Sequence, residues 1–320
     1  MPVHVARDWA HTPVDSRGTR FTCVHHPELV AHCLAQCRTG RNDRTTEISR
    51  ESFRRATWTP DGPGVLEVCG PVSSLPVVRG HGPGGPWLVQ SWGRLRGDHD
   101  RSVALVSRHQ AVERAMRNWS ALPLGASGTP YHELLPAVLA QRITAKEAAV
   151  QWHRMVDRWG ERAPDPEGRL KLPPSPERLA EVPYHEFHTL GIEKRRADTI
   201  REVARNFRWL AHDWFDGERQ TPEDATASLR RIRGVGVWTA AVVGGIAFGD
   251  PDALLVGDFH VKNTVAWALH GRPRGTDEEM LESLASYAGQ RHRVVRWLQL
   301  DGWRAPRRGP RRRIVSIGRL

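Results

Sequence analysis

The sequence contains little lysine, little cysteine and no long apolar run. Only four of its 320 residues are lysine and four are cysteine, and the longest apolar run extends from Thr239 to Gly249. A helix that crosses a bilayer needs roughly 18 apolar residues, so no membrane-spanning helix is expected. The first residues, Met1 to Asp8, lack the apolar core of a signal peptide. We therefore expect a cytoplasmic protein with no membrane partner.

The few cysteines and the histidine pairs form only weak metal-binding patterns. All four cysteines lie in the first quarter of the chain without a Cys-x-x-Cys pair: Cys23, Cys33, Cys37 and Cys69. A disulfide framework is not expected in a large cytosolic protein. Cys23 is followed by His25 and His26, but strand alternation would turn these histidines to opposite faces. The pair His185 and His188 lacks further ligands nearby, so we expect no structural metal in these places.

Positive charge exceeds negative charge, but it is concentrated at one end of the chain. Lysine and arginine number 47 against 36 acidic residues, a formal net charge of +11. Residues 291–320 contain ten arginines and a single acid, Asp301, so the rest of the chain is nearly neutral. We expect the basic tail, residues 306–320, to add nonspecific, salt-sensitive affinity for phosphate. A merely solvated tail is the alternative.

Composition divides the rest of the chain into two parts, and the predicted fold class is α+β. Residues 1–125 combine strand-like segments with turn clusters and are predicted to form a β-rich N-terminal domain. From about Pro130, apolar residues recur at three- and four-residue spacing, so residues 126–305 are predicted to form an all-α domain.

Particular elements can be assigned within both parts. In the first part we expect a strand at Arg20–Val24, a short helix at Pro27–Cys37, a β-hairpin with arms at Phe53–Trp58 and Val65–Val68, and a turn cluster at Gly80–Pro86. In the second part we expect helices at Pro176–Val182, Lys194–Leu210, Pro222–Ile232, Trp238–Phe248, Phe259–Leu269 and Glu278–Tyr287.

The segment from Thr221 to Val243 is the most informative. Thr221 occupies an N-cap position and Pro222 the first helical position, and this helix stops at Arg233-Gly234-Val235-Gly236. A second helix begins at once, which gives a helix–hairpin–helix unit. Its glycines allow a tight turn and close approach to a surface, and its second helix presents free N–H groups that suit a phosphate oxygen. An ordinary αα-turn with glycine caps is the alternative.

Asp258 stands at the predicted start of a later helix. As an N-cap it would accept backbone N–H bonds and remain ionised. An ionised carboxylate beside a DNA groove can stabilise an oxocarbenium-like sugar as a base departs, or orient the attacking water. The plain interpretation of Asp258 as an N-cap is compatible with this role.

These motifs together resemble a known family. The run from Leu229 to Ala240, with Asp258 22 residues after Gly236, is similar to the helix–hairpin–helix (HhH-GPD) DNA glycosylase superfamily. The nearest branch is 3-methyladenine DNA glycosylase II, which excises alkylated purines. Upstream, Leu134–Thr144 resembles the family's helix and wedge loop, and Leu190–Ala197 its other DNA-facing turn. The resemblance covers about residues 130–300 and implies a helical glycosylase domain after a smaller β-rich domain.

The resemblance implies roles for residues that meet the damaged base. Asp258 matches the catalytic aspartate, and Trp238 matches an aromatic side chain that lines the base pocket. Arg142 falls where relatives insert a side chain into the base stack to fill the gap left by the extruded base. Gln141 adjoins this wedge and is expected to contact the base left unpaired.

The resemblance also implies how the DNA backbone is held. Gly234, Val235 and Gly236 match the hairpin that grips a phosphate, often through a bound monovalent cation, and Thr239 belongs to the same DNA-binding set. No iron–sulfur cluster is expected, because the cluster-bearing branch has four cysteines after the catalytic region and this chain has none beyond Cys69.

Several positions depart from the family pattern. Relatives that also nick the strand carry a lysine nucleophile in the hairpin helix, where this chain has Trp238, and Lys262 is an imperfect substitute. We therefore expect no Schiff-base lyase chemistry. Val242 stands where a tyrosine can occur, and Gln290 lies near an expected late aromatic position. Base preference is therefore left open.

The sequence thus predicts a monofunctional N-glycosylase, a hydrolase of base excision repair that acts on alkylated purines of the 3-methyladenine type. Its expected partner is double-stranded DNA with damaged bases, which it would bind as a monomer in the bacterial cytosol or nucleoid. One alternative is the same fold acting on a deaminated, oxidised or bulky-adduct base. Another is a non-catalytic protein that binds damaged DNA, with Asp258 only a helix cap.

Overall fold

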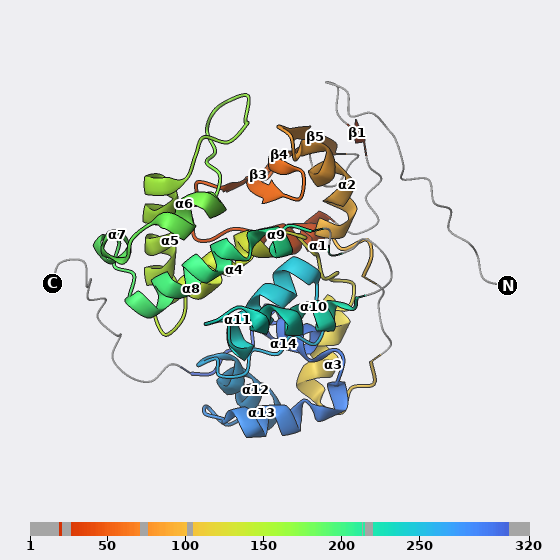
Figure 1. Cartoon of the computed structure of the whole chain (residues 1–320). Coiled ribbons are helices and arrows are strands. Elements are labelled where there is room, and N and C mark those ends of the chain that lie inside the picture. The colour runs from red at the N-terminus through yellow and green to blue at the C-terminus, as the bar shows by residue number, and fades with distance from the viewer. Residues whose placement is uncertain are drawn as a thin grey trace.

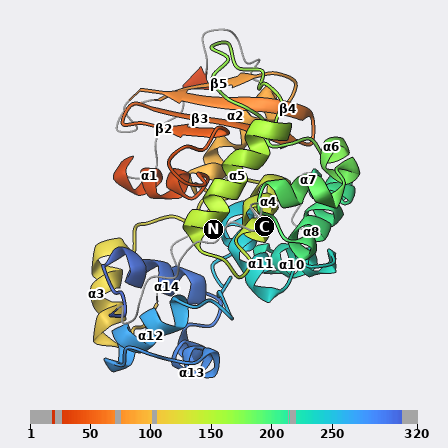
Figure 2. The same cartoon turned by 90° about the vertical axis from the view of Figure 1, so that its left-hand side faces the viewer.

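The computed structural model sets an antiparallel sheet against a larger group of helices (Figure 1). It describes residues 19–20, 27–70, 76–100, 105–212, 214 and 220–306. The predicted order, a β-rich part followed by a helical part, is confirmed. In Figure 2 the strands lie at one end of the molecule, and α12 (Val261–His270), α13 (Asp277–Ser283) and α14 (Arg291–Leu300) lie at the other.

The sheet has the order β1-β5-β4-β3-β2, and all neighbouring strands are antiparallel. The predicted hairpin is confirmed: β3 and β4 pair from Ser52 opposite Cys69 to Thr59 opposite Gly62. Of the strand expected at Arg20–Val24, residues 21–24 lie outside the described residues. The strands are β1 (Thr19–Arg20), β2 (Thr46–Ile48), β3 (Ser52–Thr59), β4 (Gly62–Cys69) and β5 (Val77–His81).

Two helices pack on the sheet and close its apolar core. The short helix predicted near residue 27 is α1 (Pro27–Ala35), and a further helix, α2 (Gly85–Leu95), follows β5. Only a turn cluster at Gly80–Pro86 is predicted in this segment, so the prediction misses α2, which begins within that cluster. Pro86 lies in the first turn of α2, and Leu88, Trp92 and Leu95 recur at helical spacing and are buried.

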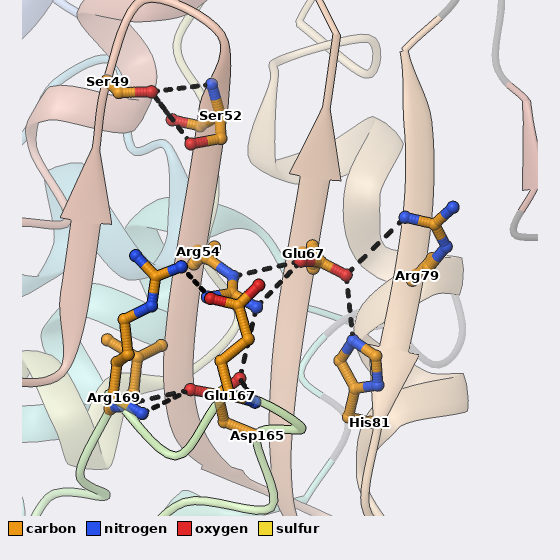
Figure 3. Close-up of polar contacts among 10 residues, drawn as sticks. Ser49, Ser52, Arg54, Glu67, Arg79, His81, Asp165, Glu167 and Arg169 are labelled. Atoms are coloured by element: carbon orange, nitrogen blue, oxygen red, sulfur yellow. Dashed lines mark hydrogen bonds and ion pairs between the residues drawn. The ribbon is translucent and has the colours of Figure 1, made fainter.

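Arg54 ties the sheet to the loop between α5 and α6 (Figure 3). Its guanidinium donates to Glu67 on β4 at 3.1 Å, to Asp165 at 3.2 Å and to Glu167 at 3.0 Å. Glu67 is also hydrogen-bonded to β5, because its Oε2 lies 3.1 Å from Nε2 of His81. The cluster joins segments more than 100 residues apart in the sequence, so it fixes the sheet to the helical part.

The helical part begins with α4 and ends with α14. Four of its predicted helices are interrupted. Pro222–Ile232 and Glu278–Tyr287 each continue as a short 3-10 helix after the α-helix ends, and the other two change before their predicted ends. Lys194–Leu210 breaks at Asn206, whose side-chain amide donates to the carbonyl of Glu202 at 2.8 Å. Trp238–Phe248 changes to a π-helix at Gly244, where an added Cβ would lie 2.1 Å from Oγ1 of Thr226.

The bounds of the helical elements are as follows. The α-helices are α3 (Gln110–Trp119), α4 (Pro130–Leu139), α5 (Ala145–Trp159), α6 (Pro176–Glu181), α7 (Tyr184–Thr189), α8 (Lys194–Arg205), α9 (Phe207–Leu210), α10 (Pro222–Ser228), α11 (Val237–Val243), α12 (Val261–His270), α13 (Asp277–Ser283) and α14 (Arg291–Leu300). The 3-10 helices are η1 (Leu229–Arg231) and η3 (Ala285–Tyr287), and the π-helix is η2 (Gly244–Phe248).

Two apolar cores lie within the helices. The first joins α4, α5, α8 and α11 around buried side chains such as Leu134, Trp152 and Ile200. The second joins α12 and α14 to α3, which comes from the first 125 residues of the chain. The loops that carry Asp258 and the hairpin are therefore attached to helices with well-buried apolar faces.

Candidate active site and nucleic-acid interface

The turn between η1 and α11 requires glycine at Gly234 for two independent reasons. Its φ of +91° lies in the left-handed region, which strains residues with a side chain. An added Cβ would also lie only 2.0 Å from Oγ1 of Thr199 on α8. The next residue, Val235, is buried in the helical core and anchors the turn.

Gly236, unlike Gly234, occupies a position that the fold itself does not reserve for glycine. It is the N-cap of α11 with an extended backbone conformation, φ −93° and ψ −178°. An added Cβ would meet nothing within 4 Å. Neither backbone strain nor internal packing demands glycine here, so open space lies over the backbone at the start of α11.

Asp258 lies just before α12. The prediction that it is the N-cap is wrong by two residues, because the helix starts at Val261 and its N-cap is His260. Its carboxylate reaches forward nevertheless: Oδ1 accepts the amide of His260 at 2.7 Å and that of Val261 at 2.9 Å. These bonds satisfy donors at the helix start and fix the orientation of the carboxylate.

The second carboxylate oxygen of Asp258 is bonded to the hairpin helix. The indole Nε1 of Trp238 donates to Oδ2 at 3.0 Å, and both side chains are half-buried. Trp238 is thus placed beside Asp258, and its ring is oriented by this hydrogen bond. Sequence reasoning identified both residues but missed this bond, because 20 residues separate them.

The loop between α4 and α5 carries Gln141 and Arg142. Arg142 has a φ of +61°, and no other described residue except glycine has a positive φ. Its side chain is exposed and forms no hydrogen bond or ion pair with the described residues. Such a conformation costs about 1–3 kcal/mol and persists only where the surroundings impose it.

Gln141 connects this loop to the hairpin. Its side-chain amide donates to the carbonyl of Gly234 at 3.1 Å and to Oγ1 of Thr239 at 2.9 Å. Thr239 is buried and is adjacent to Trp238 in α11. The structure therefore brings together Gln141, Gly234 and Thr239, and through α11 it links them to Asp258.

Two features of the Asp258 loop escaped sequence reasoning. Phe259 is 63% exposed, although it directly follows Asp258, and the Arg274 guanidinium lies 5.8 Å from its ring centre. Asp277 accepts the amide of Gly257 at 2.9 Å and binds the ammonium of Lys262 at 2.9 Å. Partial burial alone would raise the pKa of Asp277, but these two partners outweigh it and hold that pKa below its usual value.

The cysteine and histidine patterns do not assemble into a metal centre in the described part of the chain. No three His, Cys, Asp or Glu side chains gather there in a way that could hold a metal ion. Cys33, Cys37 and Cys69 carry free thiols. Cys23, His25 and His26 lie outside the described residues.

A helix that crosses a bilayer has to be both long and apolar. No helix in the described ranges combines the length and the apolar character needed for a crossing.

Comparison with known proteins identifies the helical part. Residues 135–289 match the model of the "HhH-GPD superfamily base excision DNA repair protein" family. DNA-3-methyladenine glycosylase 1 of Schizosaccharomyces pombe is 23% identical over 146 residues, which are 45% of this chain and 60% of that enzyme. The "Probable bifunctional transcriptional activator/DNA repair enzyme AlkA" of Mycobacterium tuberculosis is 34% identical over 131 residues, 39% of this chain and 25% of that protein. The matched segment thus spans less than two thirds of either relative.

The likeness of fold is more extensive. A 3-methyladenine DNA-glycosylase from Archaeoglobus fulgidus superposes with a TM-score of 0.65 at 16% identity, covering 88% of this chain and 96% of that one. Residues 135–289 of this chain belong to the HhH-GPD superfamily of base excision DNA repair proteins, and their homologues include 3-methyladenine DNA glycosylases.

Proposed function

We propose that this protein is a monofunctional DNA glycosylase that extrudes an alkylated purine of the 3-methyladenine type from duplex DNA and hydrolyses its N-glycosidic bond. The carboxylate of Asp258 carries this proposal. It is held by two amides at the start of α12 and by Trp238 of the hairpin helix. The relatives named for 3-methyladenine excision support the same class of substrate.

The chemistry requires an anion that does not need to reorganise during the reaction. The electron pair of the bond between C1′ and the base leaves with the base, and the sugar gains oxocarbenium character. An alkylated purine is already cationic, so it leaves readily. A carboxylate has about four lone-pair sites, and three of those on Asp258 are occupied. The remaining site can face the sugar or orient the water that adds to C1′.

A base inside a duplex must be rotated outward before this chemistry can begin, at a cost of a few kcal/mol. Arg142 is assigned the role of filling the gap. Its exposed side chain, free of internal partners in the described structure, stands on a strained backbone next to Gln141. Gln141 holds the loop between α4 and α5 against the hairpin through its hydrogen bonds to Gly234 and Thr239.

The hairpin is assigned to the DNA backbone. The open space over Gly236 permits a phosphate to approach the main chain. The carbonyl of Gly234 accepts one hydrogen bond from Gln141 and retains a second lone pair. A carbonyl oxygen with a free lone pair can be a ligand of the monovalent cation that the family resemblance implies. Such a cation would supply positive charge between the hairpin and a phosphate.

Release of free bases from methylated DNA tests the proposal. Purified protein is incubated with methylated duplex DNA, and the released bases are identified by mass spectrometry. We expect 3-methyladenine or 7-methylguanine from the unaltered protein. Asp258→Asn should abolish release and leave DNA binding largely intact, because the amide keeps the shape of the side chain but loses the negative charge.

Asp61→Asn is the matched control, since Asp61 is an exposed carboxylate in the β3–β4 turn, outside the proposed site. It should release bases at the unaltered rate. If the protein excises a deaminated, oxidised or bulky-adduct base but releases neither methylated base, its substrate is another lesion. Binding of damaged DNA with no excision from a panel of lesions would favour a non-catalytic binding protein. Full activity of Asp258→Asn would remove Asp258 from the chemistry.

A further inference from the structure

Helix α8 lies beneath three turns of the proposed DNA-facing surface. These turns are the loop 140–144, the turn at Gly191, and the hairpin turn 234–236. Each turn joins a different pair of helices. The local sequence of one turn therefore cannot set its position relative to the other two. Two residues one helical turn apart on α8, Arg196 and Thr199, are linked to all three turns. Thr199 lies against Gly234 itself, and Arg196 reaches the other two turns through the last residue of α4 and a side chain of α5.

Arg196 holds the first two turns. It is 3% exposed, and its Nη1 donates to the carbonyl of Leu139 at 2.7 Å and to Oε1 of Gln151 at 2.7 Å. Leu139 is the last residue of α4, three residues before Arg142. Gln151, itself 2% exposed, donates in turn to the carbonyl of Gly191 at 2.5 Å. One guanidinium therefore connects the start of the loop 140–144 to the turn at Gly191.

The third turn rests on the same face of α8. The close approach of Gly234 to Thr199 leaves no room for a side chain between them. Gln141 closes the arrangement, because it comes from the loop that Arg196 holds and donates to Gly234. The loop 140–144 is thus fixed at one end by Arg196 and at the other by the hairpin.

Arg196 is poorly explained as a stabilising residue. Among the described residues no carboxylate oxygen lies within ion-pair distance of its guanidinium, and its Nε has no hydrogen-bond partner there. The partners are a helix C-terminal carbonyl, whose dipole favours a cation, and a neutral amide. Burial lowers the pKa of Arg196, and Glu193 and Glu147 only oppose this effect from a distance. A buried cation with no ion-pair partner is costly to desolvate, so hydrogen bonding to these two groups offsets that cost and contributes little net stability.

We propose that Arg196 is a positioning residue that holds the loop 140–144 in the conformation needed for base extrusion. The inference rests on the proposed glycosylase function, because it assigns a task to Arg142 within that reaction. Arg196 touches neither base nor sugar and acts through the backbone of Leu139.

Two substrates distinguish positioning from general support. One is a duplex with the lesion paired, and the other has the lesion in a single-nucleotide bulge, already outside the stack. Arg196→Met should slow single-turnover excision from the paired duplex by about tenfold, since a small displacement of a positioned group is enough for such a loss. Excision from the bulge should fall by no more than about twofold, because extrusion is already done. Arg154→Met, at an exposed position of α5, is the control and should change neither rate.

A double-mutant cycle identifies the route of the effect. If Arg196 acts through the loop, Arg142→Ala combined with Arg196→Met should lose no more than Arg142→Ala alone. Gln151→Met, which breaks the link to Gly191, provides a second variant if Arg196→Met unfolds at a markedly lower temperature in circular dichroism. Equal losses on both substrates, or additive losses in the cycle, would overturn the proposal.

A base-unstacking measurement separates this inference from the glycosylase proposal. Fluorescence of 2-aminopurine beside the lesion rises when the neighbouring base leaves the stack, with or without excision. If the unaltered protein releases no base but raises the fluorescence, and Arg196→Met does not, the glycosylase proposal fails and the positioning role stands. If both proteins raise it equally, or neither does, the positioning role is wrong.

Discussion

The indole of Trp238 donates a hydrogen bond to the carboxylate of Asp258 across 3.0 Å. The two residues belong to different motifs, the hairpin helix and the loop before α12, and this bond is what joins those motifs into one site. Its consequence is that the ring of Trp238 has two separable properties: an apolar face that can stack on a base, and an N–H that orients the carboxylate.

Trp238→Phe separates these properties, because it keeps a ring and removes the donor. We expect single-turnover excision to slow by about tenfold, the scale of a lost hydrogen bond to a charged group, with little change in DNA affinity. Trp238→Ala should weaken affinity as well. Trp209→Phe, half-buried in α9, is the control for loss of an indole. Reduced affinity with an unchanged rate in Trp238→Phe would show that the ring only stacks.

The two hairpin glycines should respond oppositely to alanine. Gly234→Ala meets both a φ of +91° and the side chain of Thr199, so it should lower the free energy of unfolding by about 1–3 kcal/mol. Gly236→Ala meets open space and should cost less than about 1 kcal/mol, yet weaken DNA binding by blocking close approach of a phosphate. Thermal unfolding and a binding titration on each variant check this pair. Normal DNA affinity in a folded Gly236→Ala protein would contradict the assigned phosphate contact.

Borohydride trapping should give no covalent protein–DNA adduct. Schiff-base chemistry needs an unprotonated lysine that can reach C1′, and the lysine nearest Asp258 in sequence, Lys262, is bound to Asp277. The measurement is gel analysis after reduction in the presence of damaged duplex, with a known lyase as the positive control. A strong adduct that disappears in Lys262→Ala would overturn the monofunctional assignment.

Stability should decline in mild acid. Burial, followed by the charge of Arg55, lowers the pKa of His132 well below its usual value, and burial with Arg296 lowers the pKa of His292 to about 4. The unfolded chain takes up protons below about pH 6.5, whereas these two imidazoles stay neutral in the folded protein. The free energy of unfolding should therefore fall as the pH decreases from about 6.5 towards 4, by up to about 1.4 kcal/mol per pH unit for each group.

Thermal unfolding between pH 7.5 and 5 at constant ionic strength measures this decline. His132→Asn should flatten the dependence, since it removes one of the two groups. An unfolding temperature that stays constant over this range would show that neither histidine is held neutral by the fold.

Deletion of residues 306–320 should weaken DNA binding and flatten its salt dependence, because phosphate contacts release counterions. Single-turnover excision at saturating enzyme should change little. Residues 307–320 lie outside the described part of the structure, so this prediction comes from charge alone. A large loss of the single-turnover rate would mean that the tail forms part of the site.

Local pattern was sufficient for the hairpin and for Asp258. A helix start at Thr221, a Gly-Val-Gly turn and a carboxylate at fixed spacing are properties of short segments, and the structure forms each of them close to where the sequence indicates. Periodicity also separated the sheet from the helices. Periodicity failed at α2, because that helix begins inside a segment rich in glycine and proline that is typical of a turn. It also failed at the beginning of α12, whose N-cap is two residues after Asp258.

Contacts across the fold could not be read in this way. The bonds of Trp238 to Asp258, of Gln141 to Gly234 and of Arg196 to Leu139 join residues 20, 93 and 57 positions apart. The sequence by itself determined the local elements, the hairpin turn and the carboxylate before α12, because residue type and spacing set local conformation. Only the tertiary structure decided how they are held, because that depends on how α4, α8, α11 and α12 pack against one another.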